Sequence, residues 1–184
     1  MELIITLAII IGIVAVWSIA TYNRFIRLSH LLKEAWSGVD VQLKRRHDLI
    51  PNLVETVKGY SGHERETLTG VTALRAQGLH SSDPHARAEA ETTLTHSLKS
   101  LFAVAEAYPE LKANEHFLSL QHTLVEIEEQ IQYARRYYNG SVRNFNILAQ
   151  SFPSNLLAGL FGFRSQEYFE VELSTEREAP DVRT

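Results

Sequence analysis

The fold is decided by residues 36–60, WSGVDVQLKRRHDLIPNLVETVKGY. Apolar residues recur in this stretch at spacings of three and four, which is typical of a helix that buries one stripe against other helices. Pro51 interrupts the stripe, but Leu49 and Leu53 keep the same register on either side of it. We therefore expect one kinked helix from about Asn23 to Gly59, rather than two helices joined by a turn.

Three further helices are predicted downstream. A second helix fits residues 64–77 and is ended by Gly78, and a third runs from about Pro84 to Ala107. The fourth has the clearest apolar spacing and should span about Ala113 to Ser151. Two long and two shorter helices favour an all-α fold with an antiparallel four-helix bundle over residues 23–151. A coiled-coil dimer is the alternative that such long apolar stripes leave open.

An uncharged run from Leu3 to Tyr22 precedes the bundle. A helix of about twenty apolar residues can cross ~30 Å of hydrocarbon. A cleaved signal peptide is the alternative, but the only early charge is the acidic Glu2, where a basic segment would be expected. Residues 1–22 are therefore predicted to be an uncleaved transmembrane anchor. Because Arg24 and Arg27 follow this span, the positive-inside rule places the N-terminus outside the cell (inner) membrane and the helical domain in the cytoplasm.

The segment of residues 152–169 begins with an apolar stretch, FPSNLLAGLFGF, that is too short to cross a membrane. If four helices alternate in direction, the fourth returns the chain to the membrane surface. The stretch then either packs on the open end of the bundle or lies on the lipid headgroups. Residues 170–184 carry charge without apolar periodicity and are expected to be a disordered tail. The candidate membrane-interface residues are Arg24, Arg27, Phe152, Leu156, Leu160, Phe161 and Phe163.

Composition excludes several kinds of site. The chain has 184 residues, a net charge of −4 and no cysteine. This charge gives no bias toward nucleic acid, and the lack of thiols excludes cysteine nucleophiles, disulfides and cysteine-based metal sites. His63 and Glu64 begin like a zinc-protease motif, but Thr67 stands where the second histidine is required. We therefore predict no catalytic, cofactor-binding or metal-binding residues.

Polar side chains interrupt the apolar stripe of the first long helix at Gln42 and Arg46, and others occur along the fourth helix. They predict a buried network in which Arg46 meets a carboxylate, with Glu128 as the first candidate. Such a pair stabilises the fold little on balance but fixes the register between helices. The alternative is a polar groove that receives a peptide or a partner helix. The candidate residues are Gln42, Arg46, His47, Asp48, Asn52, Glu128, Arg135 and Asn139.

Several sequence blocks together resemble the LemA family of bacterial membrane-anchored proteins. Besides residues 36–60, they are GHE at 62–64, AEAYPELKAN at 105–114, ARRYYN at 134–139 and FPSN at 152–155. The resemblance implies an N-terminal membrane anchor, a cytoplasmic all-helical domain and no established enzymatic activity, so it transfers no catalytic residues. Genes of the family often neighbour one for a membrane-bound zinc metalloprotease, which suggests a role near membrane-protein quality control.

From these observations we expect a scaffold or adaptor that presents a helical bundle to protein partners at the membrane. The expected partners are the lipid bilayer and a membrane or cytoplasmic protein, such as a membrane metalloprotease. Nucleic acid and cofactors are not expected, and self-association into a homo-oligomer is left open. The alternatives are a membrane-shaping or lipid-interface protein and a metal-dependent sensor or enzyme.

Overall fold

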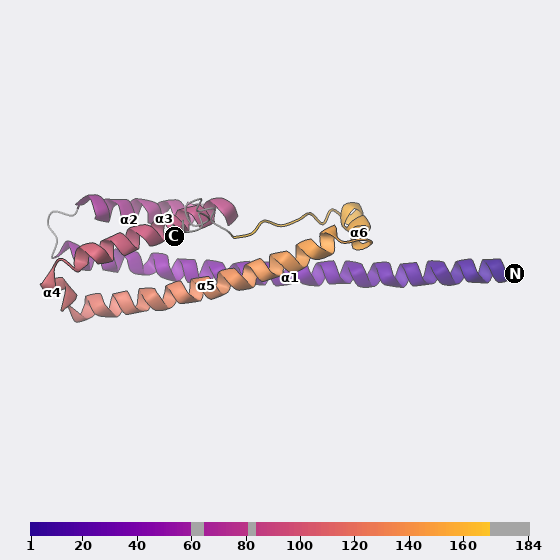
Figure 1. Cartoon of the computed structure of the whole chain (residues 1–184), viewed down its shortest axis with the longest axis horizontal. Coiled ribbons are helices and arrows are strands. Elements are labelled where there is room, and N and C mark those ends of the chain that lie inside the picture. The colour runs from indigo at the N-terminus through magenta and orange to yellow at the C-terminus, as the bar shows by residue number, and fades with distance from the viewer. Residues whose placement is uncertain (60–64, 81–83, 170–184) are drawn as a thin grey trace, which may run out of the picture. The chain divides into compact units, whose positions relative to one another are not determined.

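The structure is a computed structural model that describes residues 1–59, 65–80 and 84–169. Within these ranges it contains helices and no strand, which confirms the predicted all-α class. The elements are α1 (Glu2–Lys58), α2 (Arg65–His80), α3 (Pro84–Ala105), α4 (Pro109–Lys112), α5 (Glu115–Gln150) and α6 (Ser154–Phe161) (Figure 1). The predicted tail, 170–184, and the motif-like pair His63 and Glu64 lie outside the described residues.

Helix α1 is uninterrupted over 57 residues, and Pro51 lies inside it. The predicted anchor therefore runs directly into the segment that forms the helical core. One stretch of α1 near the N-terminus is long and apolar enough to cross a membrane, and no part of it is buried by the described residues. Its length and composition make it a candidate membrane span.

Two predicted helix ends differ from those in the structure. Helix α2 continues through Gly78 to His80, so this glycine does not end it. A glycine inside a helix costs about 1 kcal/mol relative to alanine, which a packed helix can tolerate. Helix α3 ends at Ala105, and Pro109 begins the short α4 as its first residue, where the missing N–H of proline leaves no helical bond unmade. Residues 154–161, inside the apolar stretch for which no helix bounds are predicted, form α6.

The chain forms two compact units. Unit 1 contains residues 1–43 and 129–167, and unit 2 contains the described parts of 44–128 with Tyr168 and Phe169. Helices α1 and α5 therefore contribute residues to both units. The antiparallel arrangement of four helices stays a prediction.

Each unit has its own apolar core. In unit 1, residues from α1, α5 and α6 form a small cluster around Phe25, Phe145, Leu148 and Ala158. In unit 2, residues from α1 to α5 form a larger one. Its buried members are Ile50, Leu53, Val54, Val57, Val71, Leu94, Leu98, Leu101, Ala105, Leu111, Phe117 and Leu124.

Candidate functional site

A cluster of charged side chains is buried inside unit 2, centred on Arg46. Helix α1 places Arg46 on its buried stripe, four residues before Ile50, so the guanidinium points into the core. Its Nη1 donates hydrogen bonds to the Glu128 carboxylate on α5 and to the Thr95 hydroxyl on α3, both at 2.7 Å. Its Nη2 donates to the Glu91 carboxylate and, at 3.2 Å, to the Glu91 backbone carbonyl. Arg46 therefore joins three helices of unit 2.

Glu91 lies between Arg46 and a second buried group, His47. The His47 Nε2 atom is 2.8 Å from Glu91 Oε1, although the two are not well aligned for a hydrogen bond. Burial acts to raise the pKa of Glu91, but nearby His47 and the positive charge of Arg46 outweigh it, and the net pKa is lowered. Glu91 is thus held ionised, and its charge is matched by Arg46. We call Arg46, His47, Glu91, Thr95 and Glu128 the Arg46 cluster.

The Arg46 cluster is closed to solvent on most sides. Arg46 is 1% exposed, His47 is 0% exposed and Glu91 is 4% exposed, while Glu128 is at the rim with 31% exposed. A substrate has no access to the inner three groups. A buried charge with several hydrogen-bond partners instead fixes how helices pair, because any other register would leave the charge unmatched.

The structure does not bring all eight predicted network residues together. Arg46, His47 and Glu128 meet in the Arg46 cluster, and the pairing of Arg46 with Glu128 is the one that the sequence suggests. Asp48 and Asn52 are exposed on α1 and take no part in it, because they fall on the outer face of the helix. The other three belong to unit 1, and each takes part in some interaction; they are Gln42, Arg135 and Asn139.

Glu91 and Thr95 supply two of the contacts to Arg46 and are not among the residues predicted from the sequence. A signal was present, because Glu91 precedes the buried Leu94 by three residues and so falls on the apolar stripe of α3. A carboxylate on a buried stripe needs a cationic partner, and Arg46 is likewise a charged residue on the buried stripe of its own helix, α1.

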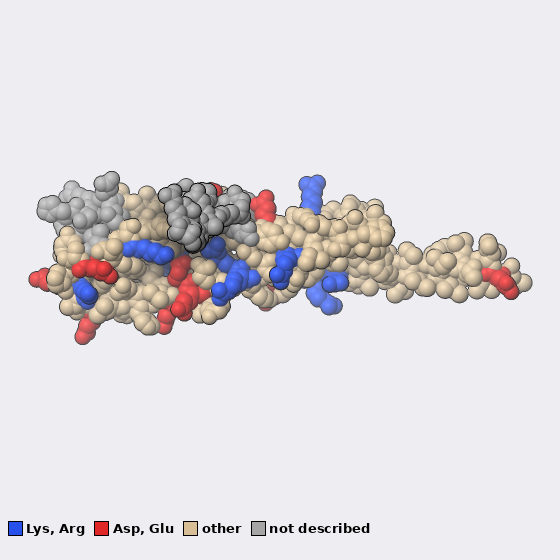
Figure 2. All heavy atoms as spheres, viewed as in Figure 1, with Lys and Arg blue, Asp and Glu red and all other residues tan. Residues whose placement is uncertain are grey.

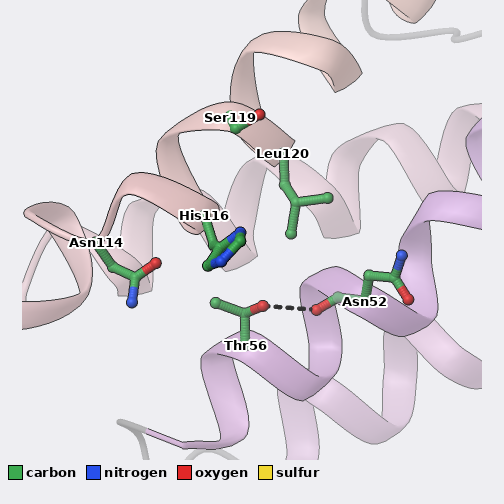
Figure 3. Close-up of a pocket in the computed structure, with 6 residues that line it drawn as sticks. All are labelled: Asn52, Thr56, Asn114, His116, Ser119 and Leu120. Atoms are coloured by element: carbon green, nitrogen blue, oxygen red, sulfur yellow. Dashed lines mark hydrogen bonds between the residues drawn. The ribbon is translucent and has the colours of Figure 1, made fainter.

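An open pocket of about 490 Å³ lies in unit 2, where α1 faces the first turns of α5 (Figure 3). Two of its polar groups are engaged within the chain. The Thr56 hydroxyl donates to the Asn52 carbonyl oxygen at 2.8 Å, and the Asn114 side chain caps α5 by accepting from the Phe117 amide at 3.0 Å. The pocket is the nearest match to the predicted polar groove, but its lining carries no fixed charge. The lining residues are Asn52, Thr56, Asn114, His116, Ser119 and Leu120.

The predicted membrane-interface residues gather in unit 1 near the end of the candidate span. The Phe163 ring stacks on Phe25, with centroids 4.5 Å apart and planes 7° apart, and the Phe161 ring meets Tyr22 at 4.9 Å. One side of α6 and Phe163 therefore pack on α1 within unit 1, and whether the segment closes the end of a bundle stays a prediction. The other side is exposed. Its apolar members are Phe152 at 80%, Leu156 at 65% and Leu160 at 75%, and Arg24 and Arg27 are also exposed on α1.

Among the described residues, no group of three or more histidine, cysteine, aspartate or glutamate side chains is arranged to hold a metal ion. Within the described part of unit 2, His47 lies 2.8 Å from the Glu91 carboxylate in the Arg46 cluster, where Arg46 already supplies the positive charge.

Comparison with known proteins gives a family and several relatives. The model of the LemA family matches residues 35–183. The chain is 25% identical over 175 residues to Magnetosome protein MamQ 2 of Paramagnetospirillum magneticum, covering 81% of this chain and 64% of that protein. It is 21% identical over 174 residues to Magnetosome protein MamQ of Magnetospirillum gryphiswaldense, covering 80% and 64%. It is also 26% identical over 147 residues to Protein LemA of Metamycoplasma hominis, covering 79% and 64%.

The chain thus spans about 64% of the length of the curated relatives that it matches. The family match begins at residue 35, after the candidate span, and includes the block at 36–60, the Arg46 cluster and α6. Because that match extends over most of the sequence, the chain belongs to the LemA family.

Proposed function

We propose that the chain is a membrane-anchored scaffold or adaptor that presents its helical surface to a protein partner. The first part of α1 anchors it, and Arg24 and Arg27 behind the span favour an orientation with the helical part in the cytoplasm, at the inner membrane. The closed Arg46 cluster supports a structural rather than a chemical use of the buried charges, because its inner groups are out of reach of a substrate.

The observation that carries the proposal is an aromatic surface on α5. Tyr133 and Tyr137 are 59% and 54% exposed, and the Arg136 guanidinium lies 4.6 Å from the centre of the Tyr133 ring. Spacings of three and four put the three side chains on one face of the helix. We call Tyr133, Arg136 and Tyr137 the α5 tyrosine face.

Tyrosine and arginine are among the residue types most enriched in the energetically important parts of protein interfaces, because each offers a large flat surface with a polar group at its end. The stacking of Arg136 on Tyr133 also orders both side chains before a partner arrives, which lowers the entropy lost on binding. In the same sequence block, the neighbouring Tyr138 is buried and serves the core. The ARRYYN block therefore places one tyrosine in the core and the adjacent one on the surface.

The partner is a membrane or cytoplasmic protein. The family resemblance favours a partner in membrane-protein quality control, such as a membrane metalloprotease. A second copy of the chain is the competing partner, and the experiment below separates the two because a self-adduct has twice the mass of the chain.

The test is site-specific photocrosslinking in intact cells. A photoreactive residue replaces Tyr137 in the full chain, and the control places it at Ser37, an exposed position on α1. The proposal expects a discrete adduct at position 137 that is absent at position 37 and is lost when Arg136→Ala is added. The same adducts at both positions, or none at either, would contradict it.

Orientation is tested separately. Because the chain has no cysteine, Val125→Cys provides a single exposed thiol in unit 2. A membrane-impermeant maleimide should label it in inverted inner-membrane vesicles and not in intact spheroplasts. Labelling in spheroplasts would reverse the proposed topology.

A further inference from the structure

The exposed side of α6 is an apolar surface next to the candidate span. Helix α6 buries Ser154 and Ala158, and its opposite side exposes Leu156 and Leu160, which are four residues apart and so lie together. Phe152, just before the helix, is also exposed. A single exposed leucine is common. Several exposed apolar side chains close together instead mark a surface that contacts another molecule or a membrane.

The position of α6 on α1 indicates what contacts this exposed apolar surface. The Phe161 ring meets Tyr22 with centroids 4.9 Å apart, and an apolar notch of about 240 Å³ is lined by Ser18, Ile19, Tyr22 and Phe161. These α1 residues form the last turn of the uncharged run. Within unit 1, α6 lies beside α1 near the end of α5, and from there α1 continues uncovered to its N-terminal end (Figure 1).

The contact between Phe161 and Tyr22 sets the depth of α6 along the candidate span. At a rise of about 1.5 Å per residue, Ile19 lies roughly 4.5 Å deeper along the helix than Tyr22. Interfacial helices bury their apolar side roughly 5–10 Å into the boundary between headgroups and acyl chains. When residues 3–22 span the bilayer, α6 is therefore at the depth of that boundary.

The distribution of charge supports the same contact with the lipid boundary. No charged residue occurs between Arg143 and Arg164, a stretch that includes all of α6. On the face shown in Figure 2, an uncharged surface continues from the region of α6 onto the N-terminal part of α1, with basic side chains at its border. Basic side chains at this level attract anionic lipid headgroups.

We propose that α6 is an interfacial helix that inserts Phe152, Leu156 and Leu160 into the lipid boundary beside the span, with an acyl chain filling the notch between Ile19 and Phe161. The protein then contacts the bilayer through two elements, a spanning helix and a helix in the membrane plane. This inference rests on the membrane anchor of the proposed function, and it adds a lipid-binding site that the anchor does not require.

The experiment measures membrane depth with single-cysteine variants of the full chain, which has no native cysteine. Leu156→Cys, Leu160→Cys and Phe152→Cys are each labelled with the polarity-sensitive fluorophore NBD. The protein is reconstituted at low density into vesicles of phosphatidylcholine and phosphatidylglycerol. Val125→Cys is the matched control, since Val125 is an exposed apolar residue in unit 2. Ile10→Cys, inside the span, is the positive control.

Lipids that carry a doxyl quencher near the headgroup should quench the probes at positions 152, 156 and 160 several-fold more strongly than the Val125 probe, and the emission of these three probes should be blue-shifted. Ile10 lies roughly 18 Å from Tyr22 along the helix, so its probe is tested with lipids that carry the doxyl group deep in the acyl chain. Quenching of the α6 probes by aqueous iodide alone, with normal lipid quenching at Ile10, would overturn the inference and leave the anchor intact. Protection from both quenchers would also overturn it, because a second chain or another protein would then cover α6. Failure of lipid quenching at Ile10 would overturn the anchor and this inference together.

Discussion

Arg46 on α1 and Glu128 on α5 are 82 residues apart in the sequence and are joined by a charged hydrogen bond of 2.7 Å. Arg46 also binds the carboxylate of Glu91, which is less exposed than that of Glu128. This difference decides how much free energy is lost when Arg46 is removed. Glu128 is 31% exposed and can be hydrated if Arg46 is removed, whereas Glu91 is 4% exposed and cannot. The stability of unit 2 therefore depends on Arg46 mainly through Glu91.

Replacing Arg46 with methionine should destabilise unit 2 strongly. The change leaves the Glu91 carboxylate buried without its cation, and breaking a buried pair in this way costs about 3–5 kcal/mol. The measurement is urea unfolding of the full chain in detergent. Lys44→Met, an exposed change two residues away, should shift the free energy of unfolding by less than about 0.5 kcal/mol. An Arg46→Met variant as stable as Lys44→Met would show that Glu91 finds another partner or becomes neutral.

Unit 2 should lose stability in acid through Glu91. Because the folded-state pKa of Glu91 is below its ordinary value of 4.5, its contribution is complete above that value and is lost as pH falls through the lowered pKa. Unfolding free energies measured between neutral pH and strong acid should therefore fall below pH 4.5. Glu91→Gln should flatten this acid limb, whereas Glu129→Gln at an exposed position should keep it. An unchanged acid limb in Glu91→Gln would exclude Glu91 as its source.

Helical spacing was sufficient to predict α1, α3 and α5, because long amphipathic segments repeat their pattern over many turns. It also singled out Arg46, since a charge on a buried stripe is unusual. It could not assign partners. Arg135 and Asn139 share a helix with Glu128, yet they belong to unit 1, because one helix face passes through two different cores.

Other features depend on contacts that no local pattern reveals. Helix α6 has only eight residues, fewer than a periodicity argument needs, and its inner side is defined by packing near Phe25 and Phe163. Asp48 and Asn52 follow Arg46 closely in sequence but point outward, because steps of two and six residues turn a helix away from its buried stripe. Nearness to Arg46 in the sequence therefore does not bring these two residues into the Arg46 cluster.

Adjacent tyrosines on α5 should respond differently to loss of the hydroxyl. The buried Tyr138 donates to the Glu167 carbonyl oxygen at 3.1 Å, and its ring contacts Trp36 at 5.2 Å, whereas Tyr137 is exposed. Tyr138→Phe should lower the free energy of unfolding by about 1 kcal/mol, the usual net value of one hydrogen bond. Tyr137→Phe is the matched control and should be neutral. Tryptophan fluorescence during urea unfolding measures the stability of both variants. Equal stabilities would show that the hydrogen bond to the Glu167 carbonyl does not stabilise the fold.

The same pair of variants should differ at alkaline pH. Burial, with a smaller effect from the negative charge of Glu167, raises the pKa of Tyr138 above its ordinary value of 10.0. A raised pKa means that the neutral phenol stabilises the fold below pH 10.0, and that this contribution is lost as pH rises through the folded-state value. Stability of the parent and of Tyr137→Phe should therefore fall in strong alkali. The stability of Tyr138→Phe should fall less. An identical fall in all three proteins would show that groups other than Tyr138 cause the alkaline loss of stability.

Several α5 side chains hold the chain after α6 against that helix, and Asn146 makes two of the hydrogen bonds. Asn146 donates from Nδ2 to the Gln166 carbonyl oxygen at 2.9 Å and accepts from the Gln166 amide at Oδ1, at 2.8 Å. Asn146→Ala removes both bonds, so hydrogen exchange of peptides from 163–169 should accelerate by a factor that corresponds to about 1–3 kcal/mol. Asn144→Ala, at an exposed position on the same helix, should leave that exchange unchanged. Asn146→Asp should give an intermediate rate, because the carboxylate still accepts from the Gln166 amide. Equal exchange in all three variants would mean that packing of Phe163, and not Asn146, retains this segment.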